Sequence, residues 1–174
     1  MLSIIIPAKN EADNLEDILN YFDGNLQNIE FELLLINDFS DDDTFVKAQN
    51  IFQNKPSFKV LNNKKKGLGG AITEGIKNAK GDRVVITMAD LSDSVKDLIN
   101  YNSLMIKEDL DAVMGSIFIK GSVVQDYPIQ KLILNRIFNF FVSILFWNKF
   151  NDYTNAFKIY KKSVLDELMP LVSE

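Results

Sequence analysis

The 174-residue chain contains no cysteine and no histidine. The absence of cysteine excludes a disulfide framework, a thiolate nucleophile and a cysteine-ligated zinc site. The absence of histidine removes the usual neutral-pH base and the commonest ligand of transition metals. A metal bound by this chain is therefore expected to be a hard ion held by oxygen atoms, such as Mg²⁺ or Mn²⁺.

The chain also has neither an excess of basic residues nor a long apolar run. Its net charge of -5 argues against a nucleic-acid binder, which needs clustered lysine and arginine to contact phosphates. The first residues have no basic start, long apolar stretch or cleavage site of the kind found in a signal peptide. The longest uncharged stretch of the apolar final third, 137–148, is shorter than the roughly 20 residues that cross a bilayer as a helix.

What is present is an alternation of strand-like and helix-like segments. Short apolar runs bounded by turn residues predict buried strands, and the spacing of Leu15, Ile18 and Phe22 is typical of a helix. We expect strands over 2–7, 31–36, 58–61, 83–87 and 112–118, and helices over 12–22, 44–52, 72–79 and 94–107. This order predicts an α/β fold with a mainly parallel sheet, in a single domain over 1–174.

The final third is rich in Ile, Leu and Phe over 129–150, with Trp147 near its end. One interpretation is a core helix, or a helix that joins copies of the chain into a homo-oligomer. The other is a helix that lies at a membrane interface, with Lys131, Arg136 and Lys149 near the headgroups. Both interpretations can hold on different faces of one helix.

Four polar clusters follow predicted strands, at 7–11, 37–44, 64–70 and 90–93. In an open α/β sheet, ligands bind outside the carboxyl ends of the strands. The first two clusters are also typical of turns and helix caps. The third combines glycines with three lysines and can meet a diphosphate near a helix start, with Lys66 best placed; the alternative is a solvated lysine run.

The fourth cluster places Asp90 and Asp93 directly after a predicted strand. Asp90 is expected to ligate a metal ion, and Asp93 either ligates the same ion through water or caps the next helix. A hard divalent ion held by one or two carboxylates and by substrate phosphates would neutralise the charge on a departing diphosphate.

In this order, the motifs together resemble the nucleotide-sugar domain of the family 2 glycosyltransferases, especially the polyprenyl-phosphate sugar transferases such as the dolichol-phosphate mannosyltransferases. The matching segments are 4–11, 37–44, 66–67 with Gly75, 81–82, 89–90, 115–116 and 152–158. The resemblance runs from Leu2 to about Leu168. It implies a three-layer GT-A (Rossmann-like) fold with amphipathic C-terminal helices. Because these enzymes usually continue further, we expect a truncated or minimal catalytic domain.

The resemblance also implies roles for individual residues. The donor nucleotide is expected on Pro7, Lys9, Glu11, Asp38, Lys66 and Ala89, the metal on Asp90, Ser92 and Asp93, and the acceptor phosphate on Arg136 with Lys120 assisting. Five departures from the family pattern bear on these roles. Met88 replaces the first acid of the Asp-Ala-Asp motif, and Asn37 replaces the first acid of the Asp-Asp-Gly-Ser loop. Phe39 and Asp43 replace glycines, and Ile117 stands where a basic residue is frequent.

The implied reaction is transfer of a hexose, with inversion, from a donor of the GDP-mannose or UDP-glucose type to a polyprenyl phosphate. An acceptor phosphate is already anionic, so the missing histidine is no objection. The implied setting is peripheral, at the cytoplasmic face of a membrane. Two alternatives remain open: a non-catalytic nucleotide-sugar-binding or membrane-scaffolding module, and a nucleotidyltransferase, which the lack of a glycine-rich first loop disfavours.

Overall fold

The computed structural model describes residues 1–119, 128–148 and 150–172. The backbone falls into two compact units, Met1–Val113 with Ile159–Glu174, and Met114–Lys158. The units are described separately below.

A six-stranded sheet forms the centre of the first unit, in the order β3-β2-β1-β4-β6-β5. The strands are β1 (Leu2–Ala8), β2 (Phe31–Asn37), β3 (Phe58–Asn62), β4 (Arg83–Ile86), β5 (Ala112–Met114) and β6 (Lys158–Lys161). β1 pairs in parallel with β2 and β4, and β2 pairs in parallel with β3. β6 runs antiparallel to β5, since Lys161 N donates to Asp111 O while Gly115 N donates to Phe157 O. The sheet is therefore mixed and mostly parallel, as predicted.

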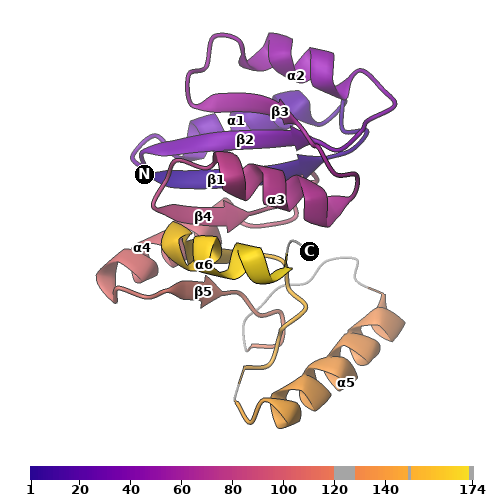
Figure 1. The fold of residues 1–174 in the computed structure, drawn as a ribbon, viewed down its shortest axis with the longest axis vertical. Coiled ribbons are helices and arrows are strands. Elements are labelled where there is room, and N and C mark those ends of the chain that lie inside the picture. Colours follow the sequence, from indigo (N-terminus) through magenta and orange to yellow (C-terminus); the bar gives the residue numbers. More distant parts are fainter. Residues whose placement is uncertain (120–127, 149, 173–174) are drawn as a thin grey trace. The chain divides into compact units, whose positions relative to one another are not determined.

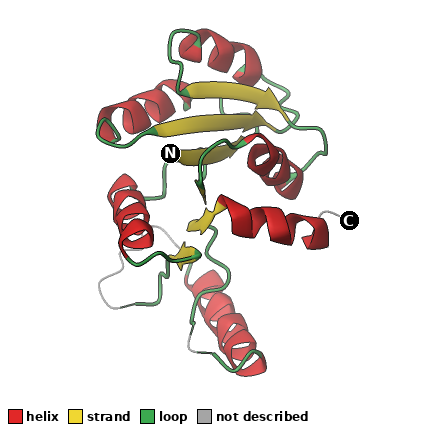
Figure 2. Cartoon of the chain, turned by 60° about the vertical axis from the view of Figure 1, so that its left-hand side comes forward, coloured by secondary structure: helices red, strands yellow, loops and turns green. Residues whose placement is uncertain are grey.

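Helices flank this sheet on both faces (Figure 1). They are α1 (Leu15–Asn25), α2 (Thr44–Phe52), α3 (Leu68–Asn78), α4 (Val95–Lys107) and α6 (Lys162–Val172). α3 and α6 cover the face turned toward the viewer in Figure 1, and α1 lies behind the strands. Figure 2 shows the same layering, with helices in red around the strands in yellow. The three-layer α/β architecture is thus confirmed.

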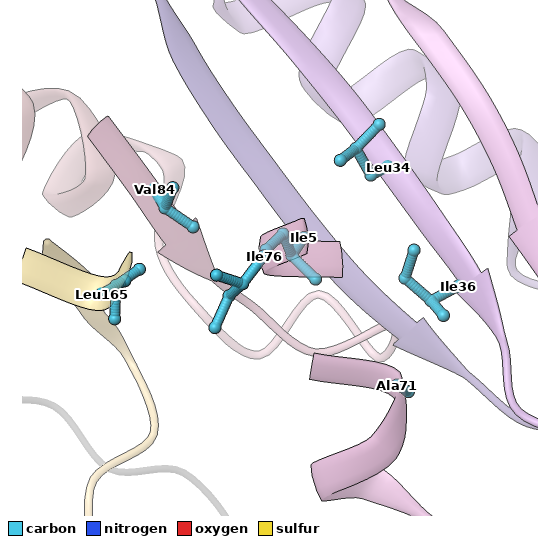
Figure 3. Packing of buried hydrophobic residues seen from close by; sticks show 7 residues of the cluster. All are labelled: Ile5, Leu34, Ile36, Ala71, Ile76, Val84 and Leu165. Atoms are coloured by element: carbon cyan, nitrogen blue, oxygen red, sulfur yellow. The ribbon is translucent and has the colours of Figure 1, made fainter. Parts of the chain in front are cut away.

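The core between the sheet and α3 joins residues far apart in the sequence. Its buried cluster contains Ile5, Leu34, Ile36, Ala71, Ile76, Val84 and Leu165, drawn in Figure 3. A glycine sets the approach of α3 to β1, because a Cβ atom on Gly75 would lie 2.4 Å from Ile5 Cγ2. All seven residues of β1 are buried, which matches its place in the middle of the sheet.

Several element boundaries differ from the sequence prediction: α1 lies at Leu15–Asn25 and not at 12–22, and the largest differences are those of α3 and β5. α3 begins at Leu68 and not at 72, because Gly69 and Gly70 continue the helix despite their low helix propensity. At Gly70 a Cβ atom would lie 1.6 Å from Lys65 O, so only glycine fits there. β5 ends at Met114 and not at 118. The sequence prediction gave no range for β6 or α6, although the family resemblance implied C-terminal helices.

The second unit contains α5 (Ile129–Leu145), whose single buried residue is Asn139. The large apolar residues of this segment that are exposed are Ile129, Ile133, Leu134, Ile137, Phe138, Phe140, Phe141, Ile144, Leu145, Phe146 and Trp147. Over 1–119, 128–148 and 150–172, no helix combines the length and the apolar character needed to cross a membrane. α5 and the two residues after it therefore present an exposed apolar surface.

Candidate functional site

A residue with left-handed backbone lies in the turn after each of three neighbouring strands. Asn10 follows β1 with φ 58°, Phe39 follows β2 with φ 53°, and Leu91 follows β4 with φ 55°. Residues other than glycine seldom adopt this left-handed conformation, and they cluster at functional sites when they do. The edge of the sheet where β1, β2 and β4 end is therefore the candidate site.

Side-chain hydrogen bonds join the turns after β1 and β2. Asn10 N donates to Ser40 Oγ at 3.0 Å, and Asp41 N donates back to Asn10 Oδ1 at 2.8 Å. Glu11 N donates to Thr44 Oγ1 at 2.9 Å. The two turns thus form one cross-linked frame beside the strand ends.

The residues predicted to contact the nucleotide lie at this edge with different exposure. Pro7 and Asp38 are buried, Glu11 is half-buried, and Lys9 is exposed. Glu11 accepts a hydrogen bond from Asn14 Nδ2 at 2.7 Å, which orients its carboxylate within the frame. Lys9 and Glu11 are accessible to a ligand, whereas Pro7 shapes the strand end.

The carboxylate of Asp38 holds the glycine-rich loop. Gly67 N lies 2.8 Å from Asp38 Oδ1 and 3.1 Å from Oδ2, and Asn63 Nδ2 donates to Oδ1 at 2.7 Å. Buried Asn63 also donates to Lys65 O and accepts from Lys65 N. Sequence reasoning missed Asn63, whose only signal is its place between a predicted strand end and the lysine run. The loop over 64–67 is therefore fixed by side chains from two strand ends.

The lysines of this loop border a groove of about 780 Å³. Lys64, Lys65 and Lys66 are exposed, and Lys64 Nζ lies 2.7 Å from Glu74 Oε1. The hydrogen bond from Lys64 lowers the pKa of Glu74. The apolar walls of the groove come from α3 and α6 and include Ile72, Ile76, Leu165, Leu168 and Met169. A basic loop thus adjoins both the strand ends and an apolar groove.

The two acidic residues after β4 have distinct surroundings. Asp90 is exposed, and its Oδ1 accepts from Ser92 N at 3.0 Å. Asp93 accepts from Thr87 Oγ1 at 2.8 Å and from Met88 N at 3.4 Å. The cap of α4 is Ser94, whose Oγ accepts from Asp97 N. The interpretation of Asp93 as a helix cap is therefore wrong, and its carboxylate stays at the strand end.

Burial raises the pKa of Asp93, hydrogen bonds from Thr87 and Met88 lower it, and the negative charge of Asp90 raises it, with a net upward shift. A cation beside both carboxylates would oppose that shift. No group of three or more histidine, cysteine or acidic side chains able to hold a metal occurs in the described residues. One or two carboxylates, with substrate phosphates and water completing the shell, suit Mg²⁺ or Mn²⁺.

A tyrosine from α1 anchors the acidic turn. Tyr21 Oη donates to Asp93 O at 3.1 Å and accepts from Val95 N at 2.8 Å. Sequence reasoning missed this contact. The only signal was a tyrosine beside the apolar stripe of the first helix.

In the second unit, Arg136 is exposed on α5 with its guanidinium carbon 5.6 Å from the centre of the Phe118 ring. Both residues border a pocket of about 170 Å³ that Asn139 and Asn151 also line. Lys120, predicted to assist Arg136, lies outside the described residues. Arg136 therefore borders a recess lined by aromatic and amide side chains, where its permanent positive charge can meet an anionic group.

Two buried polar residues order this unit. Asn139 donates to Asn135 O at 2.8 Å and accepts from Tyr153 N at 2.5 Å. Asp152 accepts from Ile117 N at 2.9 Å and from Asn155 N at 3.1 Å. The segment 152–158 was expected from its resemblance to the family, whereas the role of Asn139 as the anchor of α5 was not.

The family is decided by a match over almost the whole chain. The model for "Glycosyl transferase family 2" matches residues 3–169. The chain belongs to glycosyl transferase family 2. The resemblance inferred from the sequence is thereby confirmed, and the family 2 chain has relatives among the enzymes that this resemblance suggested.

The family 2 chain is 33% identical over 135 residues to a dolichol-phosphate mannosyltransferase from Pyrococcus furiosus, covering 78% of the chain and 38% of that protein. It is 26% identical over 184 residues to a dolichyl-phosphate beta-glucosyltransferase from Dictyostelium discoideum, covering 97% of the chain and 56% of that protein. The family 2 chain thus spans about two-fifths to just over half of the length of these relatives.

Solved glycosyltransferase structures share the fold of the family 2 chain. A mannosyltransferase from Pyrobaculum calidifontis in complex with GDP-Man and Mn²⁺ superposes with a TM-score of 0.66 at 18% identity, over 96% of the chain and 46% of that protein. A glucosyl-3-phosphoglycerate synthase from Mycobacterium tuberculosis in complex with Mn²⁺, UDP and phosphoglyceric acid gives 0.67 at 16% identity, over 95% of the chain and 57% of that protein. The predicted GT-A fold is confirmed.

Proposed function

We propose that the chain, as a single domain over 1–174, is the nucleotide-sugar-binding part of a metal-dependent inverting glycosyltransferase. The observation that carries the proposal is the arrangement at one edge of the sheet. Exposed Asp90, half-buried Asp93 and the Asp38-held loop with Lys66 all follow strands of the same sheet. This edge is where open α/β sheets bind their ligands.

The proposed donor is a nucleotide diphosphate hexose of the GDP-mannose or UDP-glucose type. Lys9, Glu11 and the Asp38 region would hold the nucleoside, and Ala89 with Lys66 would adjoin the diphosphate. Support comes from the relatives, which are named as dolichol-phosphate sugar transferases, and from the GDP-Man and UDP complexes of the structural neighbours. Lys66 is exposed, so its ammonium is accessible to a phosphate.

Asp90, Asp93 and Ser92 would hold the divalent ion. Bound there, Mg²⁺ or Mn²⁺ supplies electrostatic stabilisation of the departing nucleoside diphosphate. Tyr21 keeps the acidic turn in place through its two hydrogen bonds. The Mn²⁺ in complexes of the structural neighbours is consistent with this assignment.

The proposed acceptor is a polyprenyl phosphate. An oxygen of its phosphate attacks the anomeric carbon from the face opposite the nucleotide, and the bond from that carbon to the β-phosphate oxygen breaks, so the configuration inverts. The attacking oxygen is already anionic, so the chain needs no strong general base. Arg136, assisted by Lys120, would hold the acceptor phosphate. The remaining task of the protein is to position both substrates.

The apolar surface of α5 supports a peripheral place at a membrane, and the face that we propose is the cytoplasmic one. Leu145 and Trp147 are 77% and 92% exposed, which water disfavours and a lipid interface accepts. From that interface, the phosphate of a lipid acceptor would have the most direct path to Arg136.

The first test is calorimetric titration of the protein with GDP-mannose and UDP-glucose, with and without Mn²⁺, on the wild type and on Asp90→Ala. Loss of even an outer partner of a metal ligand costs about 10–100-fold in affinity, so Asp90→Ala should lower the Mn²⁺-dependent affinity at least that much. Asp97→Ala, which removes an exposed acid of α4, is the matched control and should bind like the wild type.

Transfer to a polyprenyl phosphate is then measured with the donor that binds. Transfer by the wild type that Asp90→Ala loses would support the whole proposal. Donor binding without transfer would favour a nucleotide-sugar-binding module, and release of pyrophosphate from a nucleoside triphosphate would favour a nucleotidyltransferase. Unchanged transfer by Asp90→Ala would contradict the proposed metal site.

A further inference from the structure

Phe39 combines an exposed aromatic ring with a strained backbone. It is 47% exposed and has φ 53°, directly after the carboxyl end of β2. A bulky residue in the left-handed region is an outlier that the surrounding structure must hold in place. Because about half of the ring is exposed, Phe39 gains only part of the free energy that full burial of its side chain would give. Packing alone therefore does not account for phenylalanine at this position.

The backbone on both sides of Phe39 is held by hydrogen bonds. Asp38 before it accepts from Gly67 N and Asn63 Nδ2, and its own N donates to Ala8 O at 2.8 Å. Ser40 after it accepts from Asn10 N at 3.0 Å. The ring therefore projects from a fixed support, which lowers the entropy lost when a ligand packs against it.

The polar groups around Phe39 are largely engaged within the protein. Asn37 Nδ2 donates to Asn62 Oδ1 at 2.9 Å, and Asn37 Oδ1 accepts from Ser40 N at 3.4 Å. Asn10 Oδ1 accepts from Asp41 N at 2.8 Å. What residues 37–40 offer to a ligand is therefore chiefly the flat apolar face of Phe39, and the exposed carboxylates of 41–43 follow directly after them. Exposed Lys9 belongs to the turn joined to residues 37–40, so a ring and an ammonium group occur in the same frame.

We propose that Phe39 is the platform on which the nucleobase of the donor stacks. This inference rests on the proposed function and identifies a residue that determines the affinity for the nucleoside. A flat base has a π-face that fits an aromatic ring, and stacking of this kind tolerates every base. The ring therefore discriminates ligands with a base from ligands without one, and leaves the choice between guanine and uracil to other groups.

The test compares Phe39→Asn and Phe39→Tyr with the wild type. Each protein is titrated with GDP, with UDP and with inorganic pyrophosphate, always with Mn²⁺. Loss of a stacked aromatic weakens base binding by about 5- to 140-fold, so Phe39→Asn should lose that factor for GDP and UDP. Its affinity for pyrophosphate should not change, and Phe39→Tyr should bind all three ligands like the wild type.

Thermal unfolding separates this role from a structural one. Asparagine tolerates the left-handed conformation better than phenylalanine, so Phe39→Asn should unfold at the same temperature as the wild type or higher. Leu104→Asn, which removes a side chain 43% exposed on α4, is the matched control for a change of surface polarity and should leave all three affinities unchanged.

The alternative outcomes are distinct. Wild-type affinity of Phe39→Asn for GDP and UDP would overturn the platform and leave the proposed function intact. A lower unfolding temperature with equal losses for all three ligands would also overturn it, since the role would then be structural. If the wild type bound neither GDP nor UDP, the proposed function itself would fail and the platform with it.

Discussion

At the scale of single residues, two helical glycines have opposite surroundings. A Cβ atom on Gly75 of α3 would lie 2.4 Å from Ile5 Cγ2, whereas one on Gly24 of α1 would meet nothing within 4 Å. The first site is a close contact with a buried branched side chain. The second lies one residue before the end of α1, where glycine mainly increases the flexibility of the unfolded chain.

Gly75→Ala should therefore lower the free energy of unfolding by about 1–3 kcal/mol, because the core must shift to accept a methyl group. Gly24→Ala should raise it by about 0.5–1 kcal/mol, because alanine has the higher helix propensity. Urea unfolding followed by circular dichroism measures both changes. An unchanged or higher free energy of unfolding for Gly75→Ala would contradict the tight packing of α3 on β1.

The sequence predicted residues of the site best where local order suffices. Asp90 directly ends a strand-like run, and the structure does place it exposed at the strand end. Asn63 and Tyr21 were not predicted, because their roles depend on contacts with Asp38 and with Asp93 that lie far away in sequence. A local pattern carries no information about such partners.

At the scale of elements, buried Glu32 of β2 ties together the amino ends of three strands and the loop before β4. Its carboxylate accepts from Ser3 Oγ at 2.8 Å, from Lys59 Nζ at 2.6 Å and from Lys80 N at 2.6 Å. Burial alone would raise the pKa of Glu32, but these hydrogen bonds and the charge of Lys59 outweigh it and hold the pKa below its ordinary value of 4.5.

A depressed carboxyl pKa makes stability depend on pH in one direction. The contribution of Glu32 should be complete above pH 4.5 and should be lost as the pH falls through the lower pKa of the folded state. Glu32→Gln should lower the free energy of unfolding by about 1–3 kcal/mol at pH 7, because the hydrogen bonds then lose their charged acceptor. The difference between the two proteins should shrink at pH 3. A constant difference in urea unfolding at both pH values would contradict this assignment.

The sequence predicted the elements in which apolar residues form a clear run or recur with a clear period, and it missed the elements that lack such a pattern. The apolar runs of β1 to β4 are long enough to identify, and so are the amphipathic stripes of α1, α2 and α4. β6 has only four residues and contains two lysines, so its pattern gives little sign of a strand between two others. The early start of α3 depends on Gly70 fitting against Lys65 O, which is a tertiary constraint.

At the scale of the whole molecule, the exposed apolar surface extends from α5 to Trp147, two residues after the helix. Because Trp147 is the single tryptophan of the chain, its fluorescence reports on the surroundings of this surface. If this surface lies in a lipid interface, Trp147 emission should shift to shorter wavelength when vesicles with anionic lipids are added. Phe141→Glu should weaken binding about 10-fold or more, since burial of one such side chain is worth about 1.5–3 kcal/mol.

Leu104→Glu, at an exposed position of α4, is the control and should bind vesicles like the wild type. An unshifted emission spectrum would contradict the membrane assignment. If the wild type instead sedimented as a dimer and Phe141→Glu as a monomer, the apolar surface would be an interface between copies of the chain.

The position of β6 in the sheet has a consequence for how the protein is made. β5 lies at the sheet edge and pairs with β6, which comes later in the chain. A ribosome adds about 5–20 residues per second, so roughly 2–9 s pass between the synthesis of Met114 and that of Lys158. During this interval the nascent chain has β1 to β4 but an open β4 edge, to which foreign strands can add. The last step of sheet assembly is thus the one that a chaperone has most reason to protect.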